Sequence, residues 1–390
     1  MFIHKAFKFR LYPNQKQREL IHKTIGCSRF VFNLFLGKQK EKDAYWSITE
    51  EMKQNGQLSS NNWKGDYLNK YETIKELPEL KKQYSFLKEV DSIALQKSVE
   101  HLADAYSRYY KKQNKLPRFK SKKNPVQSYV TKHTNGNIAV IDDQIKLPKL
   151  GLVRFAKSRE VHGRILSATI RRNPSGKYFV SLTTKVEGTE LPKTNSAVGI
   201  DVGLKDFAIL SDGTIYSNPK FFRSLEEKLV KAQRILSRRQ ERALQQKKPL
   251  DEAKNYQKQR KKVARIHEKI VNARTDYLQK ISTEIIKSHD VIGIEDLKVA
   301  NMRKNHHLAK AISEASWSQF RTMLEYKAEW YGKTVIAVHP ARTSQRCHAC
   351  GHIEKANRPS QAEFVCQKCG HTDNADVNAS KNIKELALAV

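Results

Sequence analysis

The sequence contains no long apolar run, which argues against a chain that crosses a membrane with hydrophobic helices. Its first residues, MFIHKAFKFRLY, alternate charged and apolar side chains, so they lack the continuous apolar segment of a signal peptide. No P-loop, dinucleotide-binding fingerprint or serine-nucleophile elbow occurs, so we expect no nucleotide-driven motor. Together these absences predict a cytoplasmic protein.

Acidic residues are scarce relative to basic ones. The 390 residues include 73 Lys or Arg and 40 Asp or Glu, which gives a formal net charge of +33. This excess goes beyond what solubility requires and indicates an extended polyanionic partner, for which nucleic acid is the default. A membrane surface is the alternative, and the missing apolar segments disfavour it. With 39% hydrophobic residues the chain can still fold into two or three domains.

Cysteine is also rare, with five residues, of which Cys27 stands alone and is expected to be a small buried side chain. The other four form two CxxC pairs, Cys347–Cys350 and Cys366–Cys369, separated by fifteen residues. In a cytosolic chain this spacing favours one structural Zn²⁺ in a ribbon over disulfides. The alternative is four unrelated reduced thiols. Candidate replacement ligands are the histidines that follow each pair, His352 and His371.

Three acidic residues stand where a carboxylate is costly unless it is paired or bound to a metal. Asp201 lies within the apolar run VGIDVGLKDFAIL, Glu295 ends the run VIGIE, and Asp376 opens the helix-like segment DVNASKNI. If they converge, they could hold two Mg²⁺ ions about 4 Å apart, one activating water and the other stabilising the leaving oxygen of a phosphodiester. Each carboxylate could instead have a purely structural role. A lone Asp in a strand is often only hydrogen-bonded, and Asp373, near Asp376, is a plausible helix N-cap.

The N-terminal half combines strands with a long helical insertion. Residues 2–12 alternate with a period of two, as in a half-buried strand. Helical spacing follows over 15–38, with an interruption expected near Gly26, and an amphipathic helix is expected at 90–110. Residues 126–187 are strand-rich. We expect residues 2–12 to join that sheet, so that the helices split a small β-barrel.

Two segments of the insertion are not expected to be helical. One is a polar loop at 55–66. The other is KKQNKLPRFKSKKN, which follows the 90–110 helix, and the chain from Arg108 to Lys123 contains eight basic residues and no acidic ones. A solvated loop is the simple interpretation, but the one-signed charge around Phe119 favours phosphate contact, with Arg118 and Lys120 as candidates.

After a linker at 191–196 the pattern becomes a β-meander followed by alternating helices and strands, which is the order of an RNase H-like fold. The basic stretch 228–274 carries sixteen Lys or Arg and four Asp or Glu. A solvated helical hairpin would explain it, but a helix pair along a duplex fits better, with Arg238, Arg260 and Lys261 as contacts. The expected strands are 197–202, 206–211, 214–217, 290–295 and 333–338, and the expected helices are 311–331 and one beginning near 374.

The segments KAFKFRLYPNQKQ, VGIDVGLKDFAI, IGIEDLKVANM, TSQRCHACG, CQKCG and DVNASKNI, in this order, resemble the TnpB family. These are transposon-encoded RNA-guided DNA endonucleases related to the type V CRISPR effectors. The resemblance implies an α+β multidomain protein: a split β-barrel (wedge) with a helical recognition insertion, then an RNase H-like (RuvC) nuclease domain interrupted by a zinc ribbon. The implied boundaries are wedge 1–13, recognition 14–122, wedge 123–190, nuclease 191–342, ribbon 343–372 and nuclease 373–390.

The resemblance also implies a site and partners. The catalytic Asp, Glu and Asp of the family fall on Asp201, Glu295 and Asp376. The implied partners of a monomeric protein are a guide RNA from the transposon end and a target duplex carrying a short flanking motif, in a bacterial or archaeal nucleoid and without a membrane. Base pairing would supply the sequence specificity. The motif would be read near Gln96, Thr134 and Asn135.

Two other functions stay open. One is an RNA-guided DNA-binding repressor or transposition regulator that seldom cuts, which three intact carboxylates disfavour. The other is a transposase that joins DNA ends, which the zinc ribbon between the second and third carboxylates disfavours.

Overall fold

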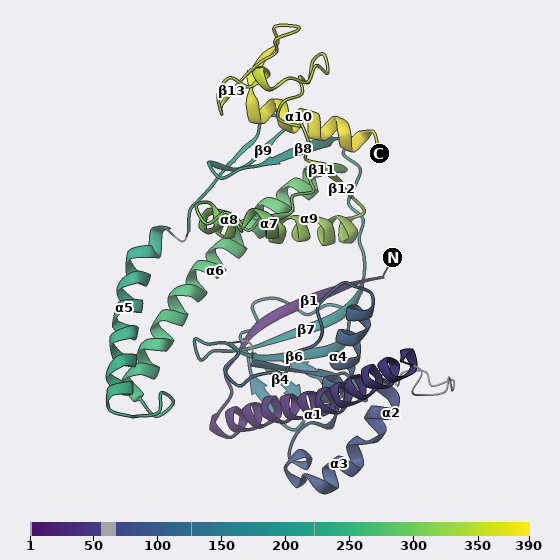
Figure 1. Ribbon diagram of the computed structural model, residues 1–390, viewed down its shortest axis with the longest axis vertical. Helices are drawn as coiled ribbons and strands as arrows, with labels where there is room; N and C mark the ends of the chain where they lie inside the picture. Colours follow the sequence, from purple (N-terminus) through teal and green to yellow (C-terminus); the bar gives the residue numbers. More distant parts are fainter. Residues whose placement is uncertain (1, 56–67, 126, 222) are drawn as a thin grey trace. The chain divides into compact units, whose positions relative to one another are not determined.

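The computed structural model describes residues 2–55, 68–125, 127–221 and 223–390 (Figure 1). These residues form two compact units, Phe2–Glu187 and Gly188–Val390. The loop expected at 55–66 lies outside the described residues except for its first position. Every helix within the described ranges is too short or too polar to cross a membrane.

The first unit contains two antiparallel sheets. The larger has the strand order β1-β7-β6-β2, and the smaller has the order β3-β4-β5. The first strand pairs with β7 along its whole length, from Phe2 opposite Glu187 to Leu11 opposite Tyr178, so the predicted pairing is confirmed. The strands are β1 (Phe2–Leu11), β2 (Gln127–Lys132), β3 (Ala139–Ile141), β4 (Gln144–Leu147), β5 (Gly151–Arg154), β6 (Arg164–Arg172) and β7 (Tyr178–Glu187).

Helices between β1 and β2 complete this unit. Their core joins Val31 and Phe35 of α1 to Leu95 and Leu102 of α4, all fully buried or nearly so. Cys27 is buried here, as expected. The elements are α1 (Gln15–Gln54), α2 (Lys70–Lys75), α3 (Leu77–Gln83), η1 (Ser85–Lys88) and α4 (Ser92–Tyr110).

The predicted interruption near Gly26 is wrong, because α1 continues through it without a break. A glycine inside a helix costs only about 1 kcal/mol relative to alanine. The flanking Ile25 and Cys27 are both buried, and packing of this kind outweighs that cost.

The second unit is built on a mixed sheet with the order β10-β9-β8-β11-β12. The first three strands form an antiparallel meander, and β11 is parallel to both β8 and β12. The predicted Asp212-Gly213 turn is present, with the Leu210 N–H donating to the Thr214 carbonyl at 2.9 Å. The strands are β8 (Ala197–Val202), β9 (Asp206–Leu210), β10 (Ile215–Ser217), β11 (Val291–Glu295) and β12 (Thr334–Val338), within two residues of the prediction at each end.

Helices cover this sheet (Figure 1). Phe320 and Leu324 of α9 are fully buried in one core with Ile281 and Ile285 of α6. On β8, a Cβ at Gly199 would lie 2.0 Å from the Ser380 carbonyl oxygen of α10, so the strand and that helix touch backbone to backbone. The helices are α5 (Arg223–Gln245), α6 (Lys254–Ser288), α7 (Val299–Met302), α8 (Ala309–Ala315), α9 (Trp317–Tyr331) and α10 (Ala375–Leu388).

Two details differ from the prediction. The single helix expected over 311–331 is divided at Ser316, whose left-handed backbone (φ 56°) ends α8 and turns the chain so that Trp317 is buried. The N-cap of α10 is Asn374, not Asp373. The Asn374 side chain accepts from the Asp376 and Val377 N–H groups. Asp373 instead forms an ion pair with Lys381 at 2.7 Å.

Candidate functional site

Asp201 and Glu295 lie side by side at one edge of the sheet. Their strands are parallel neighbours, and the last pair in register is Ile200 with Ile294, one residue before each carboxylate. Asp376 lies in the first turn of α10, the helix that packs on these strands. Asp201 and Asp376 line one cavity of about 210 Å³. The structure therefore brings the three carboxylates singled out in the sequence to one place.

The surroundings of Asp201 strongly disfavour its ionised form. Burial, followed by the charges of Glu295 and Asp376, raises its pKa from 3.8 to about 7, and only the opposing charge of Arg358 and a backbone hydrogen bond offset this. Burial also raises the pKa of Glu295. A carboxylate held ionised here needs a cation nearby, and hard oxygen ligands of this kind suit Mg²⁺.

Two side chains that sequence reasoning missed contact the carboxylates directly. The Thr343 hydroxyl donates to Glu295 Oε1 at 2.6 Å. Arg358 Nη2 donates to Asp376 Oδ1 at 2.7 Å. Both residues belong to the segment after β12 that carries the cysteines. Neither sits in an apolar run or a periodic pattern, so nothing in the sequence alone distinguished them from surface residues.

The three carboxylates do not form a compact ligand cluster of the kind that the cysteines form. Among the described residues, the four cysteines form the only group of three or more possible ligands whose atoms all lie within 4.8 Å of one another. Carboxylate oxygens are suitable ligands for a cation, and a bound cation would offset the negative charge that burial of Asp201 disfavours. Asp376 is paired with Arg358, whose positive charge also offsets part of the negative charge of the site.

The cysteine cluster has the geometry of a tetrahedral thiolate site. Cys347 Sγ lies 3.7 Å from Cys369 Sγ, and Cys350 Sγ lies 3.6 Å from Cys366 Sγ. Four sulfurs about 2.3 Å from a central Zn²⁺ would be about 3.8 Å apart, so these two distances match a zinc site, and all four sulfurs lie within 4.8 Å of one another. The predicted ligand set is brought together. His352 instead contacts Glu354 at 3.0 Å.

The two cysteine pairs are built alike. Cys347 N–H donates to the His352 carbonyl at 2.8 Å, and Cys366 N–H donates to the His371 carbonyl at 2.9 Å. Each loop ends at a glycine with a left-handed backbone: Gly351 has a φ of 74° and Gly370 a φ of 70°. The remaining elements of the ribbon are η2 (Lys355–Asn357) and an antiparallel pair, β13 (Glu363–Val365) and β14 (Thr372–Asn374).

Two fully buried asparagines of α10 tie the root of the ribbon to the helix that carries Asp376. Asn378 Nδ2 donates to the Arg346 carbonyl at 2.7 Å and its Oδ1 accepts from the His348 N–H at 3.0 Å. Asn382 Nδ2 donates to the Thr343 carbonyl at 2.9 Å. The ribbon and the carboxylates therefore belong to one hydrogen-bonded assembly.

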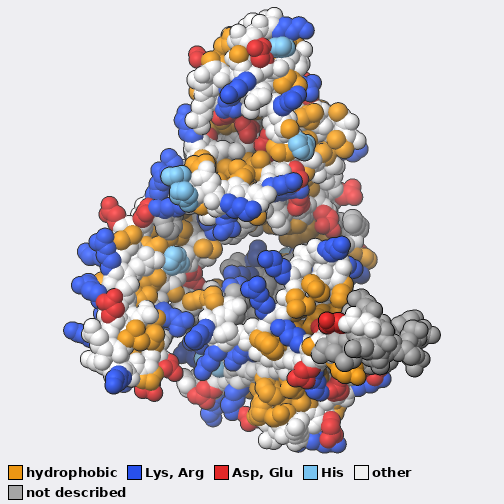
Figure 2. All heavy atoms as spheres, in the orientation of Figure 1, with side chains coloured by type: hydrophobic (Ala, Val, Ile, Leu, Met, Phe, Trp, Pro, Cys, Tyr) orange, Lys and Arg blue, Asp and Glu red, His pale blue; other side chains and the backbone are white. Residues whose placement is uncertain are grey.

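The candidate nucleic-acid contacts are all exposed. In the first unit an ion pair of 2.5 Å between Glu100 and Lys132 joins α4, which carries Gln96, to the strand that leads to Thr134. In the second unit Arg238 lies along a groove on α5. Figure 2 shows Lys and Arg side chains distributed along the α5–α6 hairpin. The exposed candidates are Gln96, Arg118, Lys120, Thr134, Asn135, Arg238, Arg260 and Lys261.

Family models match three parts of the chain: "Probable transposase" over residues 179–306, "Cas12f1-like, TNB domain" over 317–383, and "Helix-turn-helix domain" over 1–44. A curated protein named "Putative RNA-guided DNA endonuclease InsQ", from Escherichia coli K12, is 36% identical over 99% of this chain and 93% of its own length. The chain belongs to the TnpB family. A "Putative RNA-guided DNA endonuclease" from Streptomyces pristinaespiralis is 32% identical to this TnpB-family chain over 99% of it and 90% of the relative.

The TnpB-family chain also shares its fold with a solved structure. The match is to a chain in "Cryo-EM structure of the Cas12f1-sgRNA-target DNA complex", with a TM-score of 0.57 and 13% identity, covering 98% of this chain and 99% of that one. The likeness supports a mixed α/β fold of the Cas12 type. The helix-turn-helix match differs from the structure, in which residues 2–44 form β1 and the greater part of the unbroken α1.

Proposed function

We propose that this protein is an RNA-guided, Mg²⁺-dependent endonuclease that cuts double-stranded DNA beside a short flanking motif, using a guide RNA from the transposon end. The observation that carries the proposal is the convergence of Asp201, Glu295 and Asp376 at the edge of the mixed sheet. Relatives named as RNA-guided DNA endonucleases, matched over nearly the whole chain, support the substrate class. The net charge of +33 suits a bound RNA and a DNA duplex together.

In this proposal the three carboxylates hold two Mg²⁺ ions, which activate water and stabilise the leaving oxygen when bound. Glu295 is oriented by the Thr343 hydroxyl. Arg358 donates a hydrogen bond to Asp376 and is well placed to contact a phosphate, since it lines the same cavity as Asp201. The four cysteines hold one structural Zn²⁺ and supply no open coordination position.

The proposal extends to the architecture. The two sheets of Phe2–Glu187 would close as the split wedge barrel around the helical recognition insertion. The mixed sheet of the second unit would be the RuvC nuclease domain, of RNase H-like order, with the ribbon inserted before its last helix. The domain boundaries given by the resemblance, and a monomeric protein within the ribonucleoprotein, belong to the same proposal.

The test is cleavage of a plasmid by the purified ribonucleoprotein. Sequencing the RNA that co-purifies gives the guide, and depletion of a library randomised beside the matched stretch gives the flanking motif. We expect linearisation of the matched plasmid only with Mg²⁺. Asp201→Asn should abolish cutting and leave RNA and target binding intact. The matched control is Asp296→Asn, because Asp296 pairs with Arg321 and should not contribute to cutting. Cutting retained in the Asp201 variant would refute the assignment.

An RNA-guided repressor that binds without cutting is the second candidate, and it would show sequence-specific binding of the plasmid without linearisation. The raised pKa of Asp201 argues against it, because a carboxylate kept at electrostatic cost is expected where it binds a cation.

A further inference from the structure

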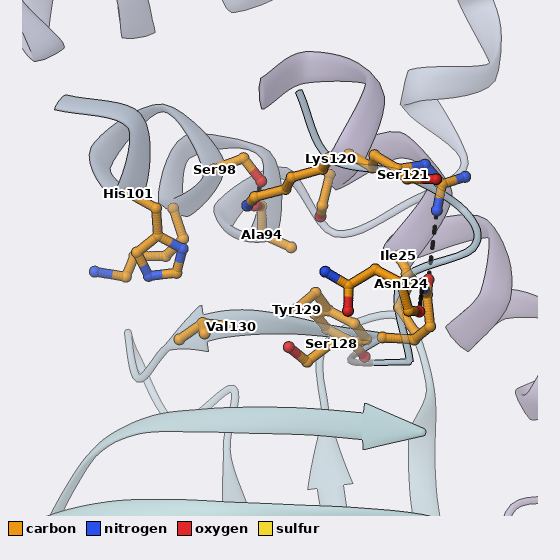
Figure 3. Close-up of a pocket in the computed structure, with 14 residues that line it drawn as sticks. Ile25, Ala94, Ser98, His101, Lys120, Ser121, Asn124, Ser128, Tyr129 and Val130 are labelled. Carbon is orange, nitrogen blue, oxygen red and sulfur yellow. Dashed lines mark hydrogen bonds between the residues drawn. The ribbon is translucent and has the colours of Figure 1, made fainter. Parts of the chain in front are cut away.

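The first unit contains a second polar cavity, separate from the carboxylate site. It has a volume of about 240 Å³ and lies between α1, α4, the basic segment after α4 and β2. This is below the about 300–1,000 Å³ typical of sites for drug-sized ligands. Figure 3 shows His101 and Ser98 of α4 and Lys120 of the basic segment facing Ser128, Tyr129 and Val130 of β2 across it.

The lining is cationic. The lining residues that the structure describes include no Asp or Glu. Arg29 donates only a long hydrogen bond of 3.4 Å to Gln127, and within the described ranges no carboxylate pairs with Arg29 or Lys120. Two acids of α4 act on the cavity-lining His101, Asp104 and Glu100, and Glu100 is shared between Lys97 at 2.7 Å and Lys132 at 2.5 Å. The cavity therefore has surplus positive charge.

Desolvation affects two basic side chains of this cavity, Lys120 and His101. Desolvation lowers the pKa of Lys120, whose ammonium lies 3.8 Å from the centre of the Phe32 ring. Desolvation, and then the charges of Lys97 and Lys120, lowers the pKa of His101. Ser28 is 6% exposed and lines the cavity, and its hydroxyl has no hydrogen-bond partner among the described residues. A buried hydroxyl without a partner costs about 1–3 kcal/mol, so its presence points to a ligand.

We propose that this cavity binds one backbone phosphate of the target DNA duplex, with Arg29 and Lys120 supplying charge and the Ser28 hydroxyl donating a hydrogen bond. A phosphodiester carries one negative charge and several acceptor oxygens and no donor, which complements this lining. The choice of DNA rests on the proposed function. Gln96 precedes the cavity-lining Lys97 on α4, and β2 leads from the cavity to Thr134, both proposed readers of the flanking motif.

The test measures target binding by the ribonucleoprotein carrying Asp201→Asn, which removes cutting from the readout. In that background Lys120→Gln and Arg29→Gln should each weaken target binding about tenfold. Each should also lower the slope of log Kd against log salt by about 0.9, the value for one lost phosphate contact. The matched control is Lys123→Gln, which removes the same charge from the same exposed segment at a position that does not line the cavity. We expect it to change Kd less than twofold.

Ser28→Ala separates binding from structure. Because the unpartnered hydroxyl destabilises the unliganded protein, removing it should leave the melting temperature unchanged or raise it, and still weaken target binding. A target with one neutral methylphosphonate linkage, moved along the flanking duplex, should weaken wild-type binding at one position and leave the Lys120→Gln complex unaffected there.

Two results would overturn the inference. The first is that the Arg29, Lys120 and Ser28 variants bind the target as tightly as the Lys123 control does. The other is a loss confined to guide-RNA association, which would assign the cavity to RNA. Failure of the nuclease proposal is distinct, since it would appear as absent cutting by the wild-type protein on a target that it still binds.

Discussion

Asp201→Asn should stabilise the metal-free protein, and the gain should grow with pH. The pKa of Asp201 is raised from 3.8 to about 7, so ionisation of this carboxyl favours the unfolded chain. Its contribution to stability is complete below pH 3.8 and is lost as the pH rises to about 7. Asparagine has nearly the same shape and no charge, so the variant escapes this loss.

The magnitude follows from the pKa difference. Without solvent screening, the pKa difference would lower the free energy of unfolding of the wild type relative to the variant by about 1 kcal/mol at pH 4.5 and about 4 kcal/mol at pH 8. Asp201 is only partly buried and opens onto a cavity, so solvent screening reduces the effect, and we expect about 2 kcal/mol at pH 8. In a unit of this size that is an increase of about 4–8 °C in melting temperature.

The assay is thermal unfolding of the wild type and the variant without Mg²⁺ at pH 4.5, 6 and 8. Comparing the two proteins at each pH cancels the titration of all other groups. Asp296→Asn is a control for which we expect a change in stability of the opposite sign. The hydrogen bond from Arg321 lowers the pKa of Asp296, so the ionised carboxylate stabilises the fold and replacing it should destabilise the protein at pH 8. Added Mg²⁺ should raise the melting temperature of the wild type and not that of Asp201→Asn. An Asp201→Asn gain that is equal at all three pH values would refute the reasoning.

Two further predictions concern the ribbon and the sheet. Elemental analysis of the wild-type protein should find one zinc per chain. Cys350→Ser should lose the zinc and most of the cutting activity. Cys27→Ser should retain the zinc and the activity, because Cys27 lies outside the cluster. Gly199→Ala should cost about 3 kcal/mol or more in urea unfolding, because the new Cβ would meet the α10 backbone at 2.0 Å. Gly213→Ala, at a left-handed turn with open space, should cost about 1–2 kcal/mol, and equal costs would contradict the close strand–helix contact.

The sequence predicts the sheets well, because their patterns are local. Alternation buries Phe7, Phe9 and Leu11 of β1 on one face, and the same alternation in β7 provides its partner. The helix errors arise where tertiary packing overrides local preference. The break at Ser316 buries Trp317, and no residue around it is a glycine or proline that would indicate a break.

The candidate site was predictable only in part. Asp201 and Glu295 are conspicuous because each interrupts or ends an apolar strand, and parallel pairing of those strands brings them together. Asp376 offered a weaker signal, because it neither interrupts nor ends an apolar strand. Thr343 and Arg358 offered none, since their contacts depend on how the ribbon folds back over the sheet edge.

These two contacts give the ribbon a role beyond its own stability. Thr343 and Arg358 lie on either side of the first cysteine pair, and each contacts a different carboxylate of the site. The buried Asn382 of α10 holds the Thr343 carbonyl, so the helix that carries Asp376 also fixes the donor that orients Glu295. The cysteine-bearing loop between the second and third carboxylates therefore contacts both of them, and a Zn²⁺ bound by its four cysteines would make these contacts more rigid than a flexible connection of the same length could.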